Sequence, residues 1–376
     1  MRKRAIVTVI NDLATDQRVS RICKTLDQEG YEILLIGRRL KKSPALPDRA
    51  YRMIRMKLPF EKGPLFYLSY NLALLFKLLT KKADLIWAND LDTLGPAFLA
   101  ARWKDRPIIY DSHELFTEVP ELEGKKWKKG IWKSLERRIL PRLPFMITVN
   151  PSIAAKYEER YGVKVHVLPN HPELSTTPQE SDREQLELPE DRFIIILQGS
   201  GINVGRGGEE ALEAVRQLQG VMLLIIGGGD RFKAIQERAE QRVGSEKVRF
   251  LERMPYERMM QYTRNADLGL SLDQPDSENY RLSTPNKLFD YIHAGVPILA
   301  SEKLPEVARV VEDHGVGELT DPFDPERIAE RIADMKARPQ DLSLYRDRAR
   351  RAASSLNWDL TGKPVIQRAL KEAKSD

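Results

Sequence analysis

A glycine-rich loop at residues 198–210, QGSGINVGRGGEE, has the residue types that bind phosphate. It follows an apolar strand and leads into a helix. Glycines let a ligand approach the backbone closely, and the free N–H groups at the start of a helix favour an anion. Arg206 adds a planar cation that can bind two phosphate oxygens, beside Gly199, Ser200 and Gly201 at the strand end. The loop predicts a phosphate site, with an ordinary strand-to-helix turn as the alternative.

Neither standard nucleotide fingerprint describes this loop. The P-loop requires Gly-Lys-Ser/Thr, which the loop lacks, and the Rossmann pattern requires a third glycine where Val204 stands. The broken fingerprint disfavours a dinucleotide-dependent oxidoreductase. A second glycine-rich strand end, IIGGGD, contributes Gly228, and a tight turn explains it as well as ligand contact does.

The segment TPNKLFDYIHAG predicts a short helix with two charged residues near its start. Thr284 can cap this helix, Pro285 suits its first position, and Gly295 suits the position after its end. Lys287 and Asp290 then lie at the carboxyl edge of the sheet, where open α/β folds bind ligands. The alternative is a surface pair three residues apart, which contributes only a few tenths of a kcal/mol.

Polar residues also follow two strands in the first half of the chain. YDSHELFTE places His113 and Glu114 just beyond a strand end. VINDLATDQR crowds three more polar residues into a loop: Asn11, Asp12 and Arg18. A single histidine is more often structural than catalytic, and capping by Thr15 or Asp16 explains part of the second cluster.

These residues need a scaffold of two α/β halves. Apolar strands such as AIVTVI alternate with helical segments, which is typical of parallel sheets covered by helices. With 376 residues the chain is long enough for two domains. We expect these domains at residues 1–170 and 192–357. A proline-rich linker at 171–191 would join them, and a helix in 358–376 would pack back on the first domain.

Composition limits the function classes. Hydrophobic content of 41% and charged content of 31% are typical of a soluble globular protein. Cys23 is the only cysteine, which excludes a disulfide framework and suits a reducing cytoplasm. The five histidines are scattered, so no metal site is predicted. The basic start is too short in apolar residues for a signal peptide, and the net charge of +6 favours an anionic partner.

Two segments have the composition of membrane-surface helices. LFYLSYNLALLFKLL, residues 65–79, is too short to span a bilayer and predicts a buried or interfacial helix. Residues 124–142 carry eight Lys or Arg against one Glu, with two Trp among apolar residues at helical spacing. This pattern favours an anionic membrane surface, with a solvated face on a packed helix as the alternative. Nucleic acid is disfavoured because no recognition module surrounds the segment.

In order and spacing, QGSGINVGRGGEEALEAV, LLIIGGGD and TPNKLFDYIHAGVPILAS resemble the donor-binding half of the retaining family-4 (group 1) glycosyltransferases. NDLATDQRV and YDSHELFTEVPE resemble a bacterial subgroup of that family. The resemblance covers nearly the whole chain.

The resemblance implies the α/β GT-B fold, in which two Rossmann-like domains face a central cleft. The first domain would bind the acceptor and the second the nucleotide-sugar. It also implies that cationic side chains and a helix N-terminus stabilise the leaving diphosphate, so neither metal nor other cofactor is expected.

The resemblance assigns roles residue by residue. The family's phosphate-loop Arg and Lys fall on Ser200 and Arg206. Its two glutamates fall on Leu282, which cannot act as a carboxylate, and on Asp290. We therefore expect Asp290 to bind the ribose, and Lys287 to supply the phosphate cation that is lost at Ser200.

The predicted site has three groups of residues. His113 matches a family histidine that reaches the sugar, and we expect it to position the transition state. The predicted catalytic residues are His113, Arg206 and Lys287. The predicted donor-binding residues are Gly199, Ser200, Gly201, Arg206, Gly228, Thr284, Pro285, Asn286, Lys287 and Asp290. The predicted acceptor-side residues are Asn11, Asp12, Arg18 and Glu114.

The predicted function is transfer of a sugar, with retention, from a UDP- or GDP-sugar to a saccharide or lipid-linked acceptor in cell-surface polysaccharide synthesis. The predicted location is the cytoplasm, with peripheral binding to the inner membrane face through residues 124–142. Two alternatives stay open. A nucleotide-sugar 2-epimerase would need several extra carboxylates, and a non-catalytic nucleotide-sugar sensor would fit the loss of the carboxylate at Leu282.

Overall fold

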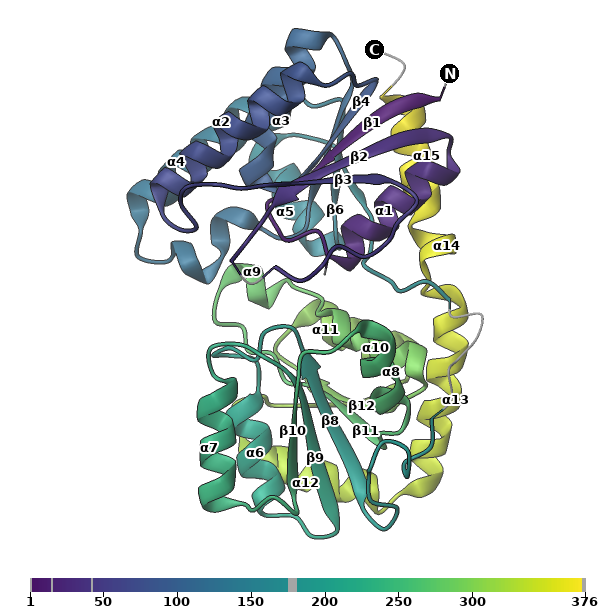
Figure 1. Ribbon diagram of the computed structural model, residues 1–376. Helices are drawn as coiled ribbons and strands as arrows, with labels where there is room; N and C mark the ends of the chain where they lie inside the picture. Colours follow the sequence, from purple (N-terminus) through teal and green to yellow (C-terminus); the bar gives the residue numbers. More distant parts are fainter. Residues whose placement is uncertain (1, 15, 42, 175–180, 374–376) are drawn as a thin grey trace. The chain divides into compact units, whose positions relative to one another are not determined.

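The chain forms two compact units in a computed structural model that describes residues 2–14, 16–41, 43–174 and 181–373 (Figure 1). The first unit comprises residues 1–170 and 361–376, and the second comprises residues 171–360. Thr15, named above as a possible cap, and residues 175–180 of the predicted linker lie outside the described residues.

The first unit is built on a seven-stranded sheet in the order β3-β2-β1-β4-β5-β6-β7. Every pair of neighbours is parallel. Its strands are β1 (Lys3–Thr8), β2 (Tyr31–Arg38), β3 (Arg52–Met56), β4 (Leu85–Asn89), β5 (Ile108–Ser112), β6 (Phe145–Thr148) and β7 (Val165–Val167). The central strands are continuous apolar runs because helices cover both of their faces.

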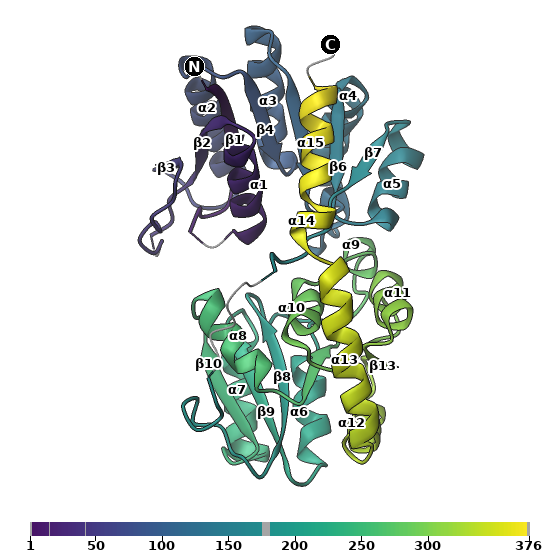
Figure 2. The ribbon, with the colours of Figure 1, turned by 90° about the vertical axis from the view of Figure 1, so that its right-hand side faces the viewer.

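Helices cover the two faces of this sheet unequally (Figures 1 and 2). On one face α2, α3 and α4 pack side by side, and on the other α1 packs against α15. The helices are α1 (Gln17–Gln28), α2 (Pro64–Thr80), α3 (Leu91–Lys104), α4 (Lys126–Ile139), α5 (Pro151–Tyr161) and α15 (Lys363–Glu372). Short 3-10 turns are η1 (Phe116–Glu118), η2 (Pro120–Leu122) and η3 (Leu140–Arg142). The C-terminal helix α15 is fixed to α1 by a hydrogen bond from Gln367 to Glu29 of 2.8 Å.

The second unit has a six-stranded parallel sheet in the order β10-β9-β8-β11-β12-β13. Its strands are β8 (Phe193–Gly199), β9 (Val221–Gly227), β10 (Val248–Glu252), β11 (Leu268–Ser271), β12 (Ile298–Ser301) and β13 (Gly317–Thr320). When strands are counted within their own unit, the second sheet has the doubly wound order 3-2-1-4-5-6, and the first sheet has the same order with a seventh strand added. The predicted α/β fold of two Rossmann-like domains is confirmed.

Two apolar cores lie on the two faces of the second sheet. One contains α6, α7 and α12, and the other contains α8, α10, α11 and α13. The helices are α6 (Gly208–Arg216), α7 (Phe232–Arg242), α8 (Tyr256–Arg264), α9 (Glu278–Arg281), α10 (Asn286–Ala294), α11 (Pro305–His314), α12 (Pro325–Lys336), α13 (Pro339–Ser355) and α14 (Trp358–Thr361). Tyr291 of α10 is fully buried, and its hydroxyl donates to the carbonyl groups of Ile196 and Leu270, so α10 is fixed against β8 and β11.

The ends of α10 show what the sequence could and could not predict. Gly295 ends the helix in the left-handed conformation with φ of 67°, as expected. The expected start is wrong by one residue: Pro285, not Thr284, is the N-cap, and Asn286 is the first helical residue. With ψ of 139°, Pro285 is still extended, so it sets the direction in which the chain enters the helix.

Candidate active site

Topology brings the candidate residues of each unit to one place. In a doubly wound sheet, ligands bind beyond the carboxyl ends of the strands where the strand order reverses. In the second unit this point lies between β8 and β11, and in the first unit between β1 and β4. The glycine-rich loop follows β8, and Asp273 lies two residues beyond β11. In the first unit Asn89 ends β4, and Asp90 follows it.

A buried ion cluster occupies the switch point of the second unit. Asp273 is 1% exposed, and its Oδ2 lies 2.9 Å from the Nζ of Lys287. Its Oδ1 accepts a hydrogen bond of 2.8 Å from Arg206. Burial alone would raise the pKa of Asp273, but Lys287 and Arg206 lower it below its usual value. Two cations and one carboxylate leave this cluster with one net positive charge.

Arg206 is placed by two further contacts. Its guanidinium lies over the ring of Tyr280, 4.1 Å from the centroid, which is a cation–π geometry. The Arg206 side chain is 24% exposed, whereas that of Lys287 is 8% exposed. Arg206 is therefore the member of the cluster that solvent reaches more easily.

The glycine-rich loop is folded closely onto the segment that carries Asp273. Gly205 and Gly207 have φ of 74° and 76°, a region that favours glycine. A Cβ atom on Gly207 would lie 2.8 Å from the carbonyl oxygen of Leu272. The Gly205 carbonyl accepts a 2.8 Å hydrogen bond from the backbone N–H of Gln274. These glycines allow the loop to approach the end of β11 and to lead into α6.

Other predicted donor-binding residues lie around the same strand ends. Gly199 ends β8, and Ser200 and Gly201 follow it. The carbonyl of Gly228, which follows β9, accepts a 2.5 Å hydrogen bond from the N–H of Ile202. Thr284 and Pro285 lead into α10, on which Asn286 is the first residue and Lys287 the second. The structure thus collects these residues within one unit.

Asp290 lies one turn further along α10, with only 7% of its surface exposed. Its Oδ1 accepts a 2.8 Å hydrogen bond from the hydroxyl of Tyr256, and its Oδ2 accepts one of 3.2 Å from the Nε2 of Gln198. Gln198 in turn accepts a 2.6 Å hydrogen bond from Thr263. Leu282, at the position of the family's first glutamate, is 4% exposed and ends the short helix α9.

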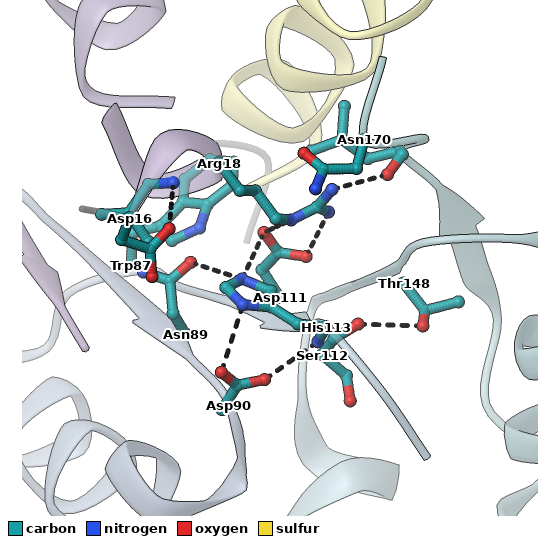
Figure 3. Close-up of polar contacts among 12 residues, drawn as sticks. Asp16, Arg18, Trp87, Asn89, Asp90, Asp111, Ser112, His113, Thr148 and Asn170 are labelled. Carbon is teal, nitrogen blue, oxygen red and sulfur yellow. Dashed lines mark hydrogen bonds and ion pairs between the residues drawn. The ribbon is translucent and has the colours of Figure 1, made fainter. Parts of the chain in front are cut away.

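In the first unit His113 lies between acidic side chains (Figure 3). Its Nδ1 is 3.1 Å from Asp90, and its Nε2 is 3.4 Å from Asp111 and 3.2 Å from the Oδ1 of Asn89. The Asp90 carboxylate also accepts a 2.9 Å hydrogen bond from the His113 backbone N–H. Burial alone would lower the pKa of His113, but Asp90 and Asp111 raise it well above its usual value. Both ring nitrogens lie within contact distance of oxygen acceptors, an arrangement that favours the protonated, hydrogen-bond-donating form of the ring.

Arg18 makes a two-point ion pair with Asp111 behind this histidine (Figure 3). The Nε and Nη2 atoms of Arg18 lie 3.0 and 2.7 Å from the two carboxylate oxygens, and the Nη1 donates to the Leu168 carbonyl at 2.9 Å. Burial alone would raise the pKa of Asp111, but Arg18 and His113 lower it to about 2. Arg18 is 3% exposed, so its guanidinium binds Asp111 and the Leu168 carbonyl and is not presented to solvent.

The other predicted acceptor-side residues make contacts of their own near this cluster. Asp12 accepts a 2.7 Å hydrogen bond from Arg55 and another from Ser43. Asn11 donates to Asp16 at 3.3 Å, and Asp16 caps α1 through the N–H of Val19. The backbone carbonyl of Glu114 accepts from Ser112 and Tyr157.

The sequence interpretation missed three carboxylates: Asp90, Asp111 and Asp273. Asp90 and Asp273 follow β4 and β11, the strands that border the two switch points. Asp111 lies near the end of β5, the strand next to β4. A polar residue directly after a fully apolar strand was the available signal. The segments ADLGLSLD, DLIWAND and PIIYD all contain it.

Comparisons with known proteins agree with this geometry. The sequence profile for Glycosyltransferase Family 4 matches residues 16–173, and that for Glycosyl transferases group 1 matches residues 178–354. A search among curated protein sequences finds no match.

Several solved structures share the fold. Sucrose-phosphate synthase from Thermosynechococcus elongatus is 17% identical, with a TM-score of 0.82 and 100% of both chains covered. A glycosyltransferase from Rickettsia africae is 13% identical, with a TM-score of 0.73 and 100% of both chains covered. Anabaena Alr3699/HepE, solved with UDP and glucose, is 16% identical, with a TM-score of 0.73 and 99% of both chains covered.

The two Rossmann-like domains in sequence, and the likeness to these solved structures over the whole chain, show the GT-B fold. The chain belongs to the retaining family-4, group 1 glycosyltransferases, which use nucleotide-sugars as donors.

Proposed function

We propose that this enzyme transfers a sugar from a UDP- or GDP-sugar to a saccharide or lipid-linked acceptor, in the synthesis of a cell-surface polysaccharide. The observation that carries the donor half of this proposal is the Arg206–Asp273–Lys287 cluster at the switch point of the second unit. UDP-sugars are the first donors to test, because Anabaena HepE has the same fold and was solved with UDP-glucose.

In this proposal the cluster and the start of α10 bind the diphosphate. The net positive charge of the cluster and the N-terminal N–H groups of the helix both favour the charge that develops as the sugar leaves. Arg206 reaches a phosphate oxygen, and Lys287 supplies the second cation that Ser200 cannot. Asp273 holds both cations in place before the ligand arrives, so little reorganisation is needed.

Asp290 is proposed to accept hydrogen bonds from the ribose hydroxyls. Asp290 lies one turn beyond Lys287 on the same helix, and hydrogen bonds from Tyr256 and Gln198 orient its carboxylate. The sugar itself must be held differently from the family pattern, because the side chain of Leu282 has no polar atom.

The chemistry follows from retention of configuration. Departure of the diphosphate creates an oxocarbenium-like centre, and the acceptor hydroxyl attacks the same face. Its proton passes to the departing phosphate oxygen, since both ring nitrogens of His113 are already engaged by Asp90, Asp111 and Asn89. We propose that His113 positions the transition state. Wild-type turnover in His113→Ala would contradict this role.

The test is to incubate the protein with UDP- and GDP-sugars and to follow the products by NMR. Transfer to an added acceptor, or slow hydrolysis of the donor, supports the proposal. Formation of the 2-epimer would identify an epimerase, and tight binding without turnover would identify a sensor. Arg206→Gln should weaken nucleoside-diphosphate binding by about 1.5–3 kcal/mol, as expected for one charge-assisted contact. Arg242→Gln, which removes an exposed arginine of α7 outside the cluster, is the matched control.

A further inference from the structure

Helix α2 of the first unit is apolar on both its buried and its exposed side. Phe66, Tyr70, Leu74 and Leu78 face the protein at spacing of four residues and are buried. The opposite side is exposed and equally apolar: Leu65, Leu68, Leu72, Phe76 and Leu79. Phe76 is 67% exposed and Leu72 is 59% exposed. A helix that is apolar all round is normally covered on every side.

The neighbouring helices extend this exposed surface. Leu99 and Trp103 are exposed on α3, and Trp127 and Ile131 are exposed on α4. Gly95 of α3 lies between Asn71 of α2 and Leu135 of α4, so the three helices are in contact along this face. Figure 1 shows α2, α3 and α4 side by side on one side of the first sheet. We call this surface the apolar face, defined by Leu65, Leu68, Leu72, Phe76, Leu79, Leu99, Trp103, Trp127 and Ile131.

The apolar face is unusual for water-exposed protein surface. Single exposed apolar residues are normal, but contiguous patches mark interaction sites. Trp103 is 82% exposed although it is among the largest apolar side chains. Of the exposed large apolar residues in the described part of the first unit, most belong to these three helices.

Exposed basic residues on and beside these helices, which we call the basic rim, outnumber the exposed acidic residues there, which are Glu61, Asp105, Glu121 and Glu123. Lys81 and Lys82 follow the end of α2, and Arg102 is exposed on α3. Further exposed basic residues lie on or beside α4: Lys125, Lys126, Arg137 and Arg138. Helix α2 itself has no acidic residue, and the single glutamate within 124–142, Glu136, is buried. Lys128 lies 5.4 Å from the ring of Trp127.

We propose that the apolar face binds an anionic lipid bilayer, with α2 lying in the headgroup region. Apolar side chains would enter the boundary between headgroups and acyl chains, tryptophans would lie at the interface, and the basic rim would contact anionic headgroups. Within the described residues no helix is long and apolar enough to cross a membrane. This inference is independent of the proposed donor chemistry, which involves the second unit.

Charge favours a bilayer over a second copy of this chain. A twofold dimer through the same surface would place two basic rims against each other, which costs free energy. An anionic membrane instead offers charges of the opposite sign to every basic residue of the rim.

The structure also changes the sequence-based prediction about residues 124–142. Trp132 of α4 faces the protein, because its ring packs edge-on against Tyr67 and Phe116 with centroid distances of 5.4 and 5.1 Å. Lys129 and Lys133 are paired with Glu118. Only part of α4 is therefore available to a membrane, and α2 presents more apolar residues than α4 does.

The first test is sedimentation with vesicles of phosphatidylcholine, with and without phosphatidylglycerol. Wild-type protein should sediment with the anionic vesicles. Leu72→Ser/Phe76→Ser should lower the partition coefficient by about tenfold or more, since two exposed apolar side chains no longer enter the lipid. Leu344→Ser/Leu360→Ser removes two exposed apolar residues from the second unit and should bind like wild type.

The second test separates charge from apolar contact. Lys125→Gln/Lys126→Gln/Lys128→Gln should weaken binding to anionic vesicles severalfold, and raised salt should have the same effect. Lys24→Gln/Lys233→Gln/Lys371→Gln removes the same charge elsewhere and should bind like wild type. Retained UDP binding and an unchanged Tm would show that each variant is folded.

Tryptophan emission gives a direct readout of contact. Brominated lipids should quench the emission of wild-type protein, because Trp103 and Trp127 both contact the bilayer. Trp103→Phe should lose most of this quenching and keep only the part that comes from Trp127. Equal vesicle binding by wild type and Leu72→Ser/Phe76→Ser would overturn the proposal. The proposal would also be overturned if wild type bound no vesicles and formed a dimer that Leu72→Ser/Phe76→Ser dissociates.

Discussion

Lys287 and Asp273 form a buried ion pair, with 2.9 Å between the Nζ and Oδ2 atoms and side chains 8% and 1% exposed. Arg206 binds the other oxygen of the same carboxylate. Because both charges are removed from water, each is stable only while its partner is present. This pair connects the start of α10 to the segment that follows β11, and both segments belong to the proposed donor site.

The first prediction concerns this pair. Lys287→Met and Asp273→Asn should each destabilise the folded protein by about 3–5 kcal/mol, because each leaves a buried charge with fewer partners. The double variant should lose less than the sum of the two single losses. Tm values of the three variants measure this coupling. Strictly additive losses would show that the two residues do not stabilise each other.

Asp290 gives the second prediction, on ribose recognition. Wild type should bind UDP more tightly than 2′,3′-dideoxy-UDP by about 1.5–3 kcal/mol, because the dideoxy nucleotide lacks the two hydroxyl groups that would donate to the Asp290 carboxylate. Asp290→Asn should reduce this difference while it keeps an oxygen for the Tyr256 hydroxyl. Calorimetry with both ligands measures the effect. If Asp290→Asn discriminated between the two nucleotides as wild type does, the ribose role would be wrong.

The sequence predicted the fold well because its signals are local. Continuous apolar strands alternate with amphipathic helices, and this alternation is sufficient to predict two parallel sheets. Gly295 predicted the end of α10 because only a residue tolerant of φ near 67° fits there. The helix start was wrong by one residue because a proline fits both the N-cap and the first helical position.

The site was harder to predict because its contacts are distant in sequence. Arg206 and Asp273 are separated by 67 positions, and Arg18 and Asp111 by 93. Spacing within a motif gives no information about such pairs. The outward direction of Trp127 was also not predictable, since apolar residues lie on both sides of α4.

His113 gives a third prediction, on pH. Burial lowers its folded-state pKa, but Asp90 and Asp111 outweigh burial and raise that pKa well above the ordinary value of 6.5. The stabilisation by its imidazolium is therefore complete below the unfolded-state value and is lost as pH rises through the folded-state value. The Tm of wild type should fall as pH rises above neutrality, and that of His113→Gln should fall less. NMR titration of the ring should show it still protonated at neutral pH. A neutral ring there would contradict the assignment.

Glu136 gives the last prediction, because its environment opposes its charge. Burial in α4 raises its pKa to about 7, although the Tyr161 hydroxyl donates a 2.5 Å hydrogen bond to it. A raised folded-state pKa means that stability is present below the unfolded-state value and is lost as pH rises through 7. Glu136→Gln removes this loss, and its amide oxygen can still accept from Tyr161. At alkaline pH the variant should be more stable than wild type by on the order of 2–3 kcal/mol, and by far less at acidic pH.

Thermal unfolding at both pH values measures this difference in stability, with the exposed Glu123→Gln as control. An equal difference at both pH values would show that Glu136 does not titrate in this range, and that burial costs its carboxylate less than the apolar packing of α4 implies.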